Sequence, residues 1–316
     1  MRGITIFSGN AHPQLAEEIC QYLGIPLSPV HIQRFSNDCI QVQLLASCRE
    51  ADVFFIQPLS PPVQENLMEL LQMLDAAKGS AAARLTAVIP HYAYARSDKK
   101  DAPRISIAGR LVADLLKTAG ADRVITMTLH SPQVHGFFSV PVDHLNALVT
   151  LARYFKERGN LDNTIVVSPD LGNAKSAAKF ARLLKLPVAA GSKQRMSDDR
   201  VVIEDIVGDV EGKDVIVLDD EIANGGTIIE TLRCLRARNA RRLSVACTHG
   251  LFTGPAIERL RAQTDLEEIV TTNTVPVPPE KRLPNMRVLS IAPLLAEAIR
   301  RTHNGESISS MFEEEI

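Results

Sequence analysis

Residues 215–230, VIVLDDEIANGGTIIE, contain the features that decide the fold of this chain. Val215 to Leu218 form a short continuous apolar run, which is typical of a parallel strand covered on both faces. The pair Gly225-Gly226 indicates a tight turn, and the residues after it have the pattern of a helix. The stretch therefore predicts a strand, a glycine turn and a helix, which together form a βα unit.

The turn has the features of a phosphate-binding site. At Asn224, Gly225 and Gly226, backbone N–H groups can crowd together, and the helix that follows adds its unpaired N-terminal donors and the positive end of its dipole. The Thr227 hydroxyl adds another donor. A simpler alternative is that the glycines only form the turn and the acids before them only cap it.

Two adjacent acids, Asp219 and Asp220, lie between the apolar run and the turn. Carboxylates repel phosphate, so we expect these side chains to face hydroxyl groups or a metal ion. A phosphorylated sugar supplies both hydroxyls and a phosphate. The stretch therefore favours a sugar phosphate as the ligand.

The composition narrows the class of protein. The 316 residues are enough for two domains of ordinary size. The formal charge is -2, from 35 basic and 37 acidic residues, so the balance favours neither a nucleic-acid partner nor a membrane surface. No apolar stretch approaches the ~20 residues of a membrane span, and MRGITIFSGN at the N-terminus contains no signal-peptide core. We therefore expect a soluble protein that is not exported.

The cysteines indicate a reducing compartment. There are five of them, none in a C-x-x-C pair, at positions Cys20, Cys39, Cys48, Cys234 and Cys247. An odd number without paired spacing argues against both a disulfide framework and a zinc site. The pattern predicts a cytoplasmic protein.

Strand-like apolar runs alternate with helical patterns along the whole chain, as in GITIFSG followed by PQLAEEICQYLG. This alternation predicts an α/β protein built from βα units with mainly parallel sheets. The pattern restarts after LNALVTLARYFKERG. We therefore expect two doubly wound domains, residues 1–147 and 148–316.

Charged residues follow several of the predicted strands, where ligands bind in open α/β sheets. They are Arg96, Lys99, Asp101, His130 and Asp170, in addition to the acid pair. Each alone has a simpler explanation, because charged loops are usually solvated and an Asp after a strand usually caps the next helix. Their joint placement indicates a binding site.

One polar segment, GSKQRMSDDR at residues 191–200, lies between two predicted strands. It carries Lys193 and Arg195, as a lid that closes over a ligand would. An exposed hairpin tip is the simpler alternative on composition alone.

Nine segments of the chain resemble, in the same order, the ribose-phosphate pyrophosphokinases, also called phosphoribosyl-pyrophosphate synthetases. Among them are FSGNAHPQLAEEI, TAVIPHYAYARSDKKD, GDVEGKDVIVLDD and THGLFTGPAIERL, and the similarity covers essentially the whole length. The resemblance implies two phosphoribosyltransferase-type domains and a Mg²⁺-dependent transfer of the β,γ-diphosphoryl group of ATP to O1 of ribose 5-phosphate, with release of AMP. It also implies a homo-oligomer, commonly a hexamer.

The resemblance assigns a ribose 5-phosphate site to the second domain. Asp219 and Asp220 would hold the ribose hydroxyls, and residues 224–227 would bind the 5-phosphate. Lys193 and Arg195 match a catalytic lid that places positive charge on the oxygens of the transferred group, which is what phosphoryl transfer requires.

An ATP site in the first domain is implied in the same way. Arg96, Lys99 and Asp101 would lie at the ATP phosphates. Phe35 and Asn37 match an adenine-binding hairpin that, in this family, reaches over from a neighbouring subunit.

Two positions match those that surround Mg²⁺-ATP in the family, His130 and Asp170. Because Mg²⁺ prefers oxygen ligands, Asp170 is the stronger candidate for the metal, and His130 would act through water or on phosphate. A regulatory phosphate or ADP site is implied at Ser47, Arg49, Ser307 and Ser309.

The chain departs from the family pattern at four positions. Ala223 replaces a carboxylate in the phosphate loop, Cys39 replaces one that contacts adenine, Ser97 replaces Gln, and Thr128 replaces Asp. A thiol cannot accept the strong hydrogen bond that a carboxylate accepts from the adenine amino group. We therefore expect loose discrimination among purine triphosphates.

Two rival functions fit parts of the pattern. One is a non-catalytic regulatory paralogue, which would be expected to lose the lid or the acid pair first. The other is a purine-salvage phosphoribosyltransferase, which shares the acid-acid-glycine loop but is usually a single domain without the adenine hairpin. Formation of AMP from ATP, Mg²⁺ and ribose 5-phosphate separates the synthetase from both.

Overall fold

The computed structural model describes residues 3–195 and 201–312, and the side chains of all of these except 193–195, 201–204, 310 and 312. The chain forms two compact units. Of the described residues, unit 1 comprises 3–146, 274–276 and 290–312, and unit 2 comprises 147–195, 201–273 and 277–289. The sequence led us to expect residues 290–312 in the second domain, whereas their contacts place them in unit 1.

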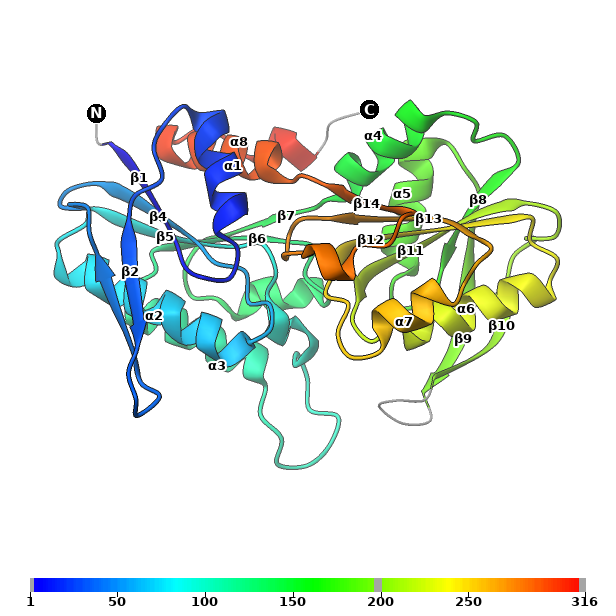
Figure 1. Cartoon of the computed structure of the whole chain (residues 1–316), viewed down its shortest axis with the longest axis horizontal. Helices are drawn as coiled ribbons and strands as arrows, with labels where there is room; N and C mark the ends of the chain where they lie inside the picture. The colour runs from blue at the N-terminus through cyan, green and yellow to red at the C-terminus, as the bar shows by residue number, and fades with distance from the viewer. Residues whose placement is uncertain (1–2, 196–200, 313–316) are drawn as a thin grey trace. The chain divides into compact units, whose positions relative to one another are not determined.

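Unit 1 is built on a five-stranded sheet in which every pairing is parallel. The strand order is β1 (Ile4–Ser8), β4 (Asp52–Ile56), β5 (Arg84–Ile89), β6 (Arg123–Met127) and β7 (Val142–Leu145). Helices α2 (Val63–Gly79) and α3 (Ala108–Ala119) lie on one side of this sheet, and α1 (Pro13–Leu23) and α8 (Ala292–Asn304) lie on the other (Figure 1). Helices on both faces explain why every residue of β4 is buried.

A separate antiparallel hairpin, β2 (Val30–Arg34) and β3 (Ile40–Leu44), belongs to unit 1 and packs on α2. Its two strands alternate partly buried and exposed side chains, as a hairpin with one covered face does. Short 3₁₀ helices follow β5 and β6, namely η1 (Ala93–Arg96) and η2 (Pro132–Phe137), and η4 (Ser309–Phe312) follows α8.

Helix α8 is tied to unit 1 by buried polar contacts as well as by its packing on α1. The Asp52 carboxylate, which is buried in β4, accepts hydrogen bonds from Arg84 Nε at 2.9 Å and pairs with His303 Nδ1 at 2.8 Å. Arg84 Nη2 also donates to the Thr302 carbonyl at 2.9 Å. Because a buried carboxylate needs such partners, these bonds select α8 as the element that covers this side of unit 1.

Unit 2 contains a seven-stranded sheet in which all pairings are parallel except that of β9 with β10. The strand order is β10 (Val201–Val207), β9 (Val188–Arg195), β8 (Thr164–Ser168), β11 (Asp214–Ile222), β12 (Arg242–Gly250), β13 (Leu266–Thr272) and β14 (Met286–Leu289). The helices are α4 (Leu148–Arg158), α5 (Ala174–Leu184), α6 (Gly226–Ala237) and α7 (Ala256–Arg261), with a 3₁₀ turn η3 (Pro279–Lys281). The α/β class with mainly parallel sheets is therefore confirmed.

Strand β11 shows why its sequence is a continuous apolar run. Val215 and Val217 pack into the core that includes α6 and α7, whereas Ile216 and Leu218 pack into the core of α4 and α5. Successive side chains of a strand point to opposite faces, so a strand between two helical layers needs apolar residues at every position. The interpretation of residues 215–218 as a doubly covered parallel strand is confirmed.

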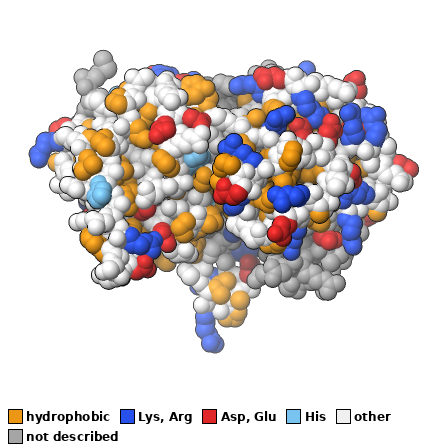
Figure 2. Space-filling view, in the orientation of Figure 1, with side chains coloured by type: hydrophobic (Ala, Val, Ile, Leu, Met, Phe, Trp, Pro, Cys, Tyr) orange, Lys and Arg blue, Asp and Glu red, His pale blue; other side chains and the backbone are white. Residues whose placement is uncertain are grey.

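Charged side chains of both signs lie on the part of the surface in view. Figure 2 shows Lys and Arg side chains interspersed with Asp and Glu side chains. None of the described helices is both long enough and apolar enough to cross a membrane.

Candidate active site

The glycine turn predicted from the sequence lies between β11 and α6 in unit 2. Gly225 has φ 78° and ψ -4°, a left-handed conformation, and α6 begins at Gly226. The Asn224 side chain accepts a hydrogen bond from the Gly226 N–H through Oδ1 at 2.9 Å. Asn224 therefore closes the turn at the helix N-terminus, where backbone donors have no partner within the helix itself.

The two glycines of the turn have different roles. A side chain at position 225 would meet only ordinary contacts, the nearest being Ala256 Cα at 3.6 Å, so its positive φ is what favours glycine. At Gly226 no positive φ is involved, but a Cβ would lie 3.3 Å from Asn224 Oδ1 and 3.6 Å from Arg259 Nη1. The first glycine allows the turn, and the second leaves space beside it.

The sequence had led us to expect the acid pair after the strand. In the structure both acids lie inside β11. Strand β11 continues to Ile222, and Asp219, Glu221 and Ile222 remain in register with β12. The strand is extended because β12 is also long, reaching Gly250, and supplies ladder partners. Both acids therefore lie on a rigid element at the carboxyl end of the sheet.

The environment of Asp219 is unfavourable for a negative charge. Burial, together with the carboxylates of Asp220 and Asp170, raises the pKa of Asp219 well above its usual range. Its neighbour across the ladder is Cys247, whose thiol pKa is raised by burial to about 12. Hydroxyl donors or a cation at this edge would relieve the repulsion among the three carboxylates.

Asp170 is held beside this acid pair by the loop that follows β8. Its Oδ1 accepts the Asn173 N–H at 3.0 Å, and Asn173 Nδ2 donates to the Leu218 carbonyl of β11 at 2.9 Å. Because β8 and β11 are parallel neighbours, their carboxyl ends lie at the same edge of the sheet. The structure thus brings together Asp170 and the acid pair.

The oxygen atoms of these carboxylates are suitable ligands for Mg²⁺. Within the described residues, no three or more His, Cys, Asp and Glu side chains are grouped so that they could hold a metal ion. Mg²⁺ usually takes only one or two protein carboxylates and completes its coordination with water and substrate phosphates. The oxygen ligands and the accumulated negative charge around Asp219 fit such an ion.

The predicted lid coincides with the β9–β10 hairpin. The backbones of Lys193 and Arg195 lie in β9, paired with Ile203 and Val201 of β10, so both residues belong to a strand and not to a loop. Their side chains, and residues 196–200, lie outside the described part of the chain. Because β9 is parallel to β8, the hairpin extends from the same sheet edge as Asp170.

Unit 1 presents the predicted ATP residues after β5 and β6. Arg96 ends η1, and Lys99 and Asp101 lie exposed in the loop that follows, with their charged atoms 3.6 Å apart. His130 is exposed and follows β6. Since β5 and β6 are parallel neighbours, the structure places these residues at one edge of the sheet of unit 1.

Ser97 closes the base of the loop that carries Lys99. Its hydroxyl donates to the Ser106 carbonyl at 3.2 Å and accepts from the Ala108 N–H at 3.0 Å, while its carbonyl accepts from the Gly109 N–H at 3.0 Å. Ser97, one of the departures from the family pattern, therefore joins the two ends of residues 97–108.

The backbone before His130 is strained. Thr128 has φ 43°, which a β-branched residue rarely adopts. Its N–H donates to the Leu145 carbonyl at 2.9 Å, and the Leu129 N–H donates to His144 Nε2 at 2.8 Å, so β7 holds the segment in place. Such strain, about 1–3 kcal/mol, is found preferentially at functional sites.

Phe35 and Asn37 lie at the tip of the β2–β3 hairpin. Phe35 is 42% exposed, so its aromatic ring is accessible to a ligand. Asn37 Oδ1 accepts the Cys39 N–H at 3.2 Å, and the Cys39 carbonyl accepts the Phe35 N–H at 2.8 Å. The tip is thus an ordered turn that presents an aromatic ring.

The four positions of the predicted regulatory site all belong to unit 1. Ser47 and Arg49 are exposed between β3 and β4, and the Ser307 carbonyl accepts from Arg301 Nη1 at 3.0 Å. The Ser309 N–H donates to Ser307 Oγ at 3.2 Å. Within the described part of the chain, no hydrogen bond joins Ser47 or Arg49 to the two C-terminal serines.

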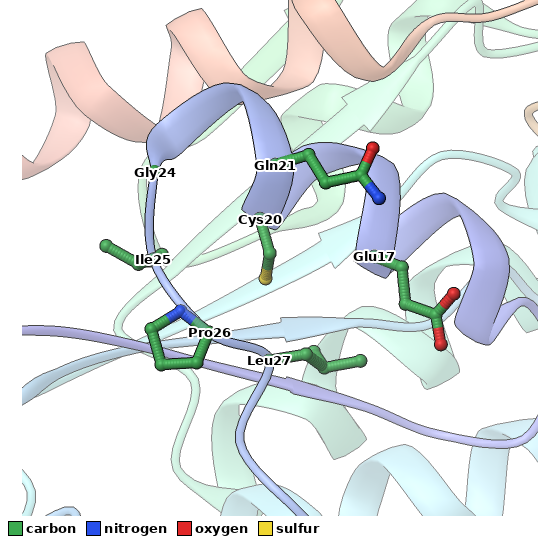
Figure 3. Close-up of a pocket in the computed structure, with 7 residues that line it drawn as sticks. All are labelled: Glu17, Cys20, Gln21, Gly24, Ile25, Pro26 and Leu27. Atoms are coloured by element: carbon green, nitrogen blue, oxygen red, sulfur yellow. The ribbon is translucent and has the colours of Figure 1, made fainter.

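Unit 1 also contains a pocket of about 300 Å³. It is formed between α1 and the segment after it, and the Cys20 side chain points into it (Figure 3). Burial, with a smaller contribution from Glu17, raises the pKa of the Cys20 thiol to about 11. None of the candidate site residues lines this pocket.

One residue at the phosphate turn was missed by the sequence reasoning. Arg259 of α7 donates from Nη1 to the Asn224 carbonyl at 3.0 Å. The contact joins residues 35 positions apart, and no local pattern indicates it. Ala223 is held nearby, since its carbonyl accepts the Thr253 N–H at 2.9 Å.

Comparisons with known proteins cover the whole chain. Residues 4–120 match the N-terminal domain of ribose phosphate pyrophosphokinase, and residues 196–313 match the phosphoribosyl synthetase-associated domain. A Streptomyces coelicolor protein provisionally named a ribose-phosphate pyrophosphokinase is 64% identical over 313 residues, which are 99% of this chain and 98% of that protein. The ribose-phosphate pyrophosphokinase of Deinococcus radiodurans is 50% identical over 98% of both chains. The crystal structure of phosphoribosylpyrophosphate synthetase from Mycobacterium smegmatis is similar with a TM-score of 0.91 at 42% identity, and covers 96% of this chain and 100% of that one.

Proposed function

This chain belongs to the ribose-phosphate pyrophosphokinase family, and on that premise we propose that it transfers the β,γ-diphosphoryl group of ATP to O1 of ribose 5-phosphate. The products are 5-phosphoribosyl 1-diphosphate and AMP. The observation that carries the proposal is the end of β11, where an acid pair is followed by a left-handed glycine turn and a helix N-terminus. That arrangement suits a ligand with hydroxyls at one end and a phosphate at the other.

The ribose 5-phosphate site is assigned to unit 2. Asp219 and Asp220 accept hydrogen bonds from the ribose hydroxyls, which offsets the repulsion that raises the pKa of Asp219. Backbone N–H groups of residues 224–227, the Thr227 hydroxyl and the N-terminus of α6 bind the 5-phosphate. Attachment at both ends orients O1 for attack.

Several residues of unit 1 are assigned to ATP. Arg96 and Lys99 bind the phosphates, with Asp101 beside Lys99, and the exposed ring of Phe35 stacks on adenine next to Asn37. Cys39 lies in the same turn and offers only a weak acceptor, which supports loose selectivity among purine triphosphates.

The proposal includes Mg²⁺ as the cofactor. Asp170 is the residue assigned to hold it, and His130 is assigned to act through water or on phosphate. When bound, the ion neutralises charge on the phosphate oxygens. Lys193 and Arg195 supply further positive charge to the transferred group, because phosphoryl transfer depends on positioning and electrostatics.

A homo-oligomer, commonly a hexamer in this family, is part of the proposal because the hairpin tip carrying Phe35 is assigned to a neighbouring subunit's ATP. A cytoplasmic location is supported by five free cysteines. Ser47, Arg49, Ser307 and Ser309 remain the residues proposed for a regulatory phosphate or ADP.

The test follows a label from the γ-phosphate of ATP in the presence of Mg²⁺ and ribose 5-phosphate. We expect the label in the sugar product and an equal amount of unlabelled AMP. Asp220→Ala should reduce this transfer strongly, whereas Asp209→Ala, which removes an exposed acid of the same unit that forms an ion pair with Lys213, should leave it unchanged. Label in free phosphate together with ADP would instead identify an ATPase, and an inactive parent would favour the regulatory paralogue.

A further inference from the structure

Helix α7 packs beside α6 (Figure 1). One of its side chains, Arg259, reaches the glycine turn. Arg259 is half-buried, and its Nη1 donates to the carbonyl of Asn224. The same nitrogen lies 3.6 Å from the position that a Cβ at Gly226 would occupy. The guanidinium therefore lies beside two residues of the turn, Asn224 and Gly226.

The charge of Arg259 is not neutralised by any carboxylate of the described residues, since none forms an ion pair with it. Other arginines of unit 2 differ in this respect. Each of the following forms an ion pair with an aspartate: Arg236, Arg238, Arg241 and Arg242. A half-buried guanidinium that contacts only a carbonyl retains its full attraction for an anion.

The turn needs an additional donor for a phosphate. The Gly226 N–H donates to Asn224 Oδ1 at 2.9 Å, so a phosphate has to share this donor with the Asn224 side chain. The Asn224 carbonyl also carries partial negative charge at the turn, and the bond from Arg259 compensates for it. A guanidinium has five N–H donors in a planar fork, so one can hold the carbonyl while others bind phosphate oxygens.

We propose that Arg259 binds the 5-phosphate of the sugar substrate and at the same time positions the turn through the Asn224 carbonyl. This inference rests on the proposed function, because it concerns the same ribose 5-phosphate site. With Arg259 in this role, unit 2 recognises the phosphate by a full positive charge in addition to backbone N–H groups and a helix dipole.

The experiment measures binding of ribose 5-phosphate by calorimetry in the presence of Mg²⁺ and α,β-methylene-ATP, together with steady-state kinetics. Arg259→Ala should raise both the Kd and the KM for ribose 5-phosphate by about 10-fold to 100-fold, as expected for loss of a hydrogen bond to a charged group. The KM for ATP should change by less than about threefold. Arg261→Ala is the matched control, because it removes an exposed arginine from the same helix, and it should change neither constant.

Arg259→Gln separates the phosphate contact from a purely structural role. Glutamine keeps an N–H donor on a shorter side chain but has no charge, so we expect a Kd for ribose 5-phosphate close to that of Arg259→Ala. A parent-like Kd for Arg259→Gln would overturn the phosphate contact, and so would a parent-like Kd for Arg259→Ala. A parent that binds ribose 5-phosphate without forming product would refute the proposed function alone, since the Kd values still decide the role of Arg259. A parent that does not bind ribose 5-phosphate would refute both.

Discussion

Replacing the two glycines of the phosphate turn one at a time should separate backbone strain from ligand binding. Gly225→Ala places a side chain at φ 78°. Gly226→Ala places one at the first residue of α6, beside Asn224 Oδ1 and Arg259 Nη1. The two substitutions add the same methyl group to adjacent positions, so each is the control for the other.

The structure gives the expected magnitudes. For Gly225→Ala, the left-handed conformation costs about 1–2 kcal/mol, and loss of freedom in the unfolded chain returns about 0.4–1 kcal/mol. The net loss is about 1 kcal/mol, or a Tm lower by about 2–4 °C, since the added Cβ makes no close contact. For Gly226→Ala, the gain in helix propensity of about 0.5–1 kcal/mol offsets the tight approach to Asn224 Oδ1 at 3.3 Å, so the Tm should hardly change.

The KM for ribose 5-phosphate should rise more in Gly226→Ala than in Gly225→Ala, which is the opposite of the order expected for the loss of Tm. The methyl group of Gly226→Ala stands against the two groups that shape the turn, so we expect the KM for ribose 5-phosphate to rise about tenfold or more, which corresponds to ~1.4 kcal/mol. Gly225→Ala should raise this KM less, provided that residue 225 keeps its positive φ angle. The assays are thermal unfolding followed by circular dichroism and initial rates at saturating ATP. A greater loss of Tm for Gly226→Ala than for Gly225→Ala would refute the assignment of strain, and an unchanged KM in both would show that the turn does not bind phosphate.

Three further predictions concern single residues. Ala223→Asp should change kcat/KM for ribose 5-phosphate by less than about tenfold, because the Ala223 carbonyl accepts the Thr253 N–H and the donors proposed for the phosphate lie at residues 224–227. Lys193→Ala should lower kcat by roughly 10² or more with a smaller effect on KM, and a change confined to KM would make Lys193 a ground-state ATP contact. Burial would raise the pKa of Asp214, but hydrogen bonds from Arg241 and Arg242 outweigh it and lower the pKa to about 2. The ionised Asp214 carboxylate therefore contributes about 1–2 kcal/mol to the free energy of unfolding. This contribution is complete above the usual aspartate pKa of ~3.9 and is lost as the pH falls through about 2. Urea unfolding between pH 5 and pH 2 should show a smaller loss of stability in Asp214→Asn than in the parent.

The sequence predicted the sheets because doubly covered parallel strands leave a simple signal. Each residue from Val215 to Leu218 contacts one of two helical layers, so hydrophobicity alone identifies the strand. The same signal fails at the strand end. Asp219 to Ile222 extend β11 because β12 offers ladder partners, and polar residues in such an extension look like a turn.

Contacts between distant residues were beyond the sequence reasoning. The apolar face of α8 indicates that this helix packs on another element, but only long-range contacts show that the element belongs to unit 1. They are its packing on α1, the bond from Arg84 to the Thr302 carbonyl and the pairing of His303 with Asp52. Arg259 meets Asn224 in the same way, through packing of α7 on α6. The roles of the site residues, including Lys193 and Arg195, remain predictions.

The place of α8 in unit 1 has a consequence for how the protein is made. The ribosome delivers the five strands of the first sheet before residue 146, yet the helix that packs on α1 emerges only with residues 292–304. Synthesis of all of unit 2 intervenes, and domains generally fold as their residues appear. The first unit to begin folding is thus the last to be completed, and for the whole of that interval α1 lacks the helix that packs on it. A nascent chain that stalls in unit 2 exposes a surface that a chaperone can recognise, and shortening the protein at its C-terminus damages the unit at its N-terminus.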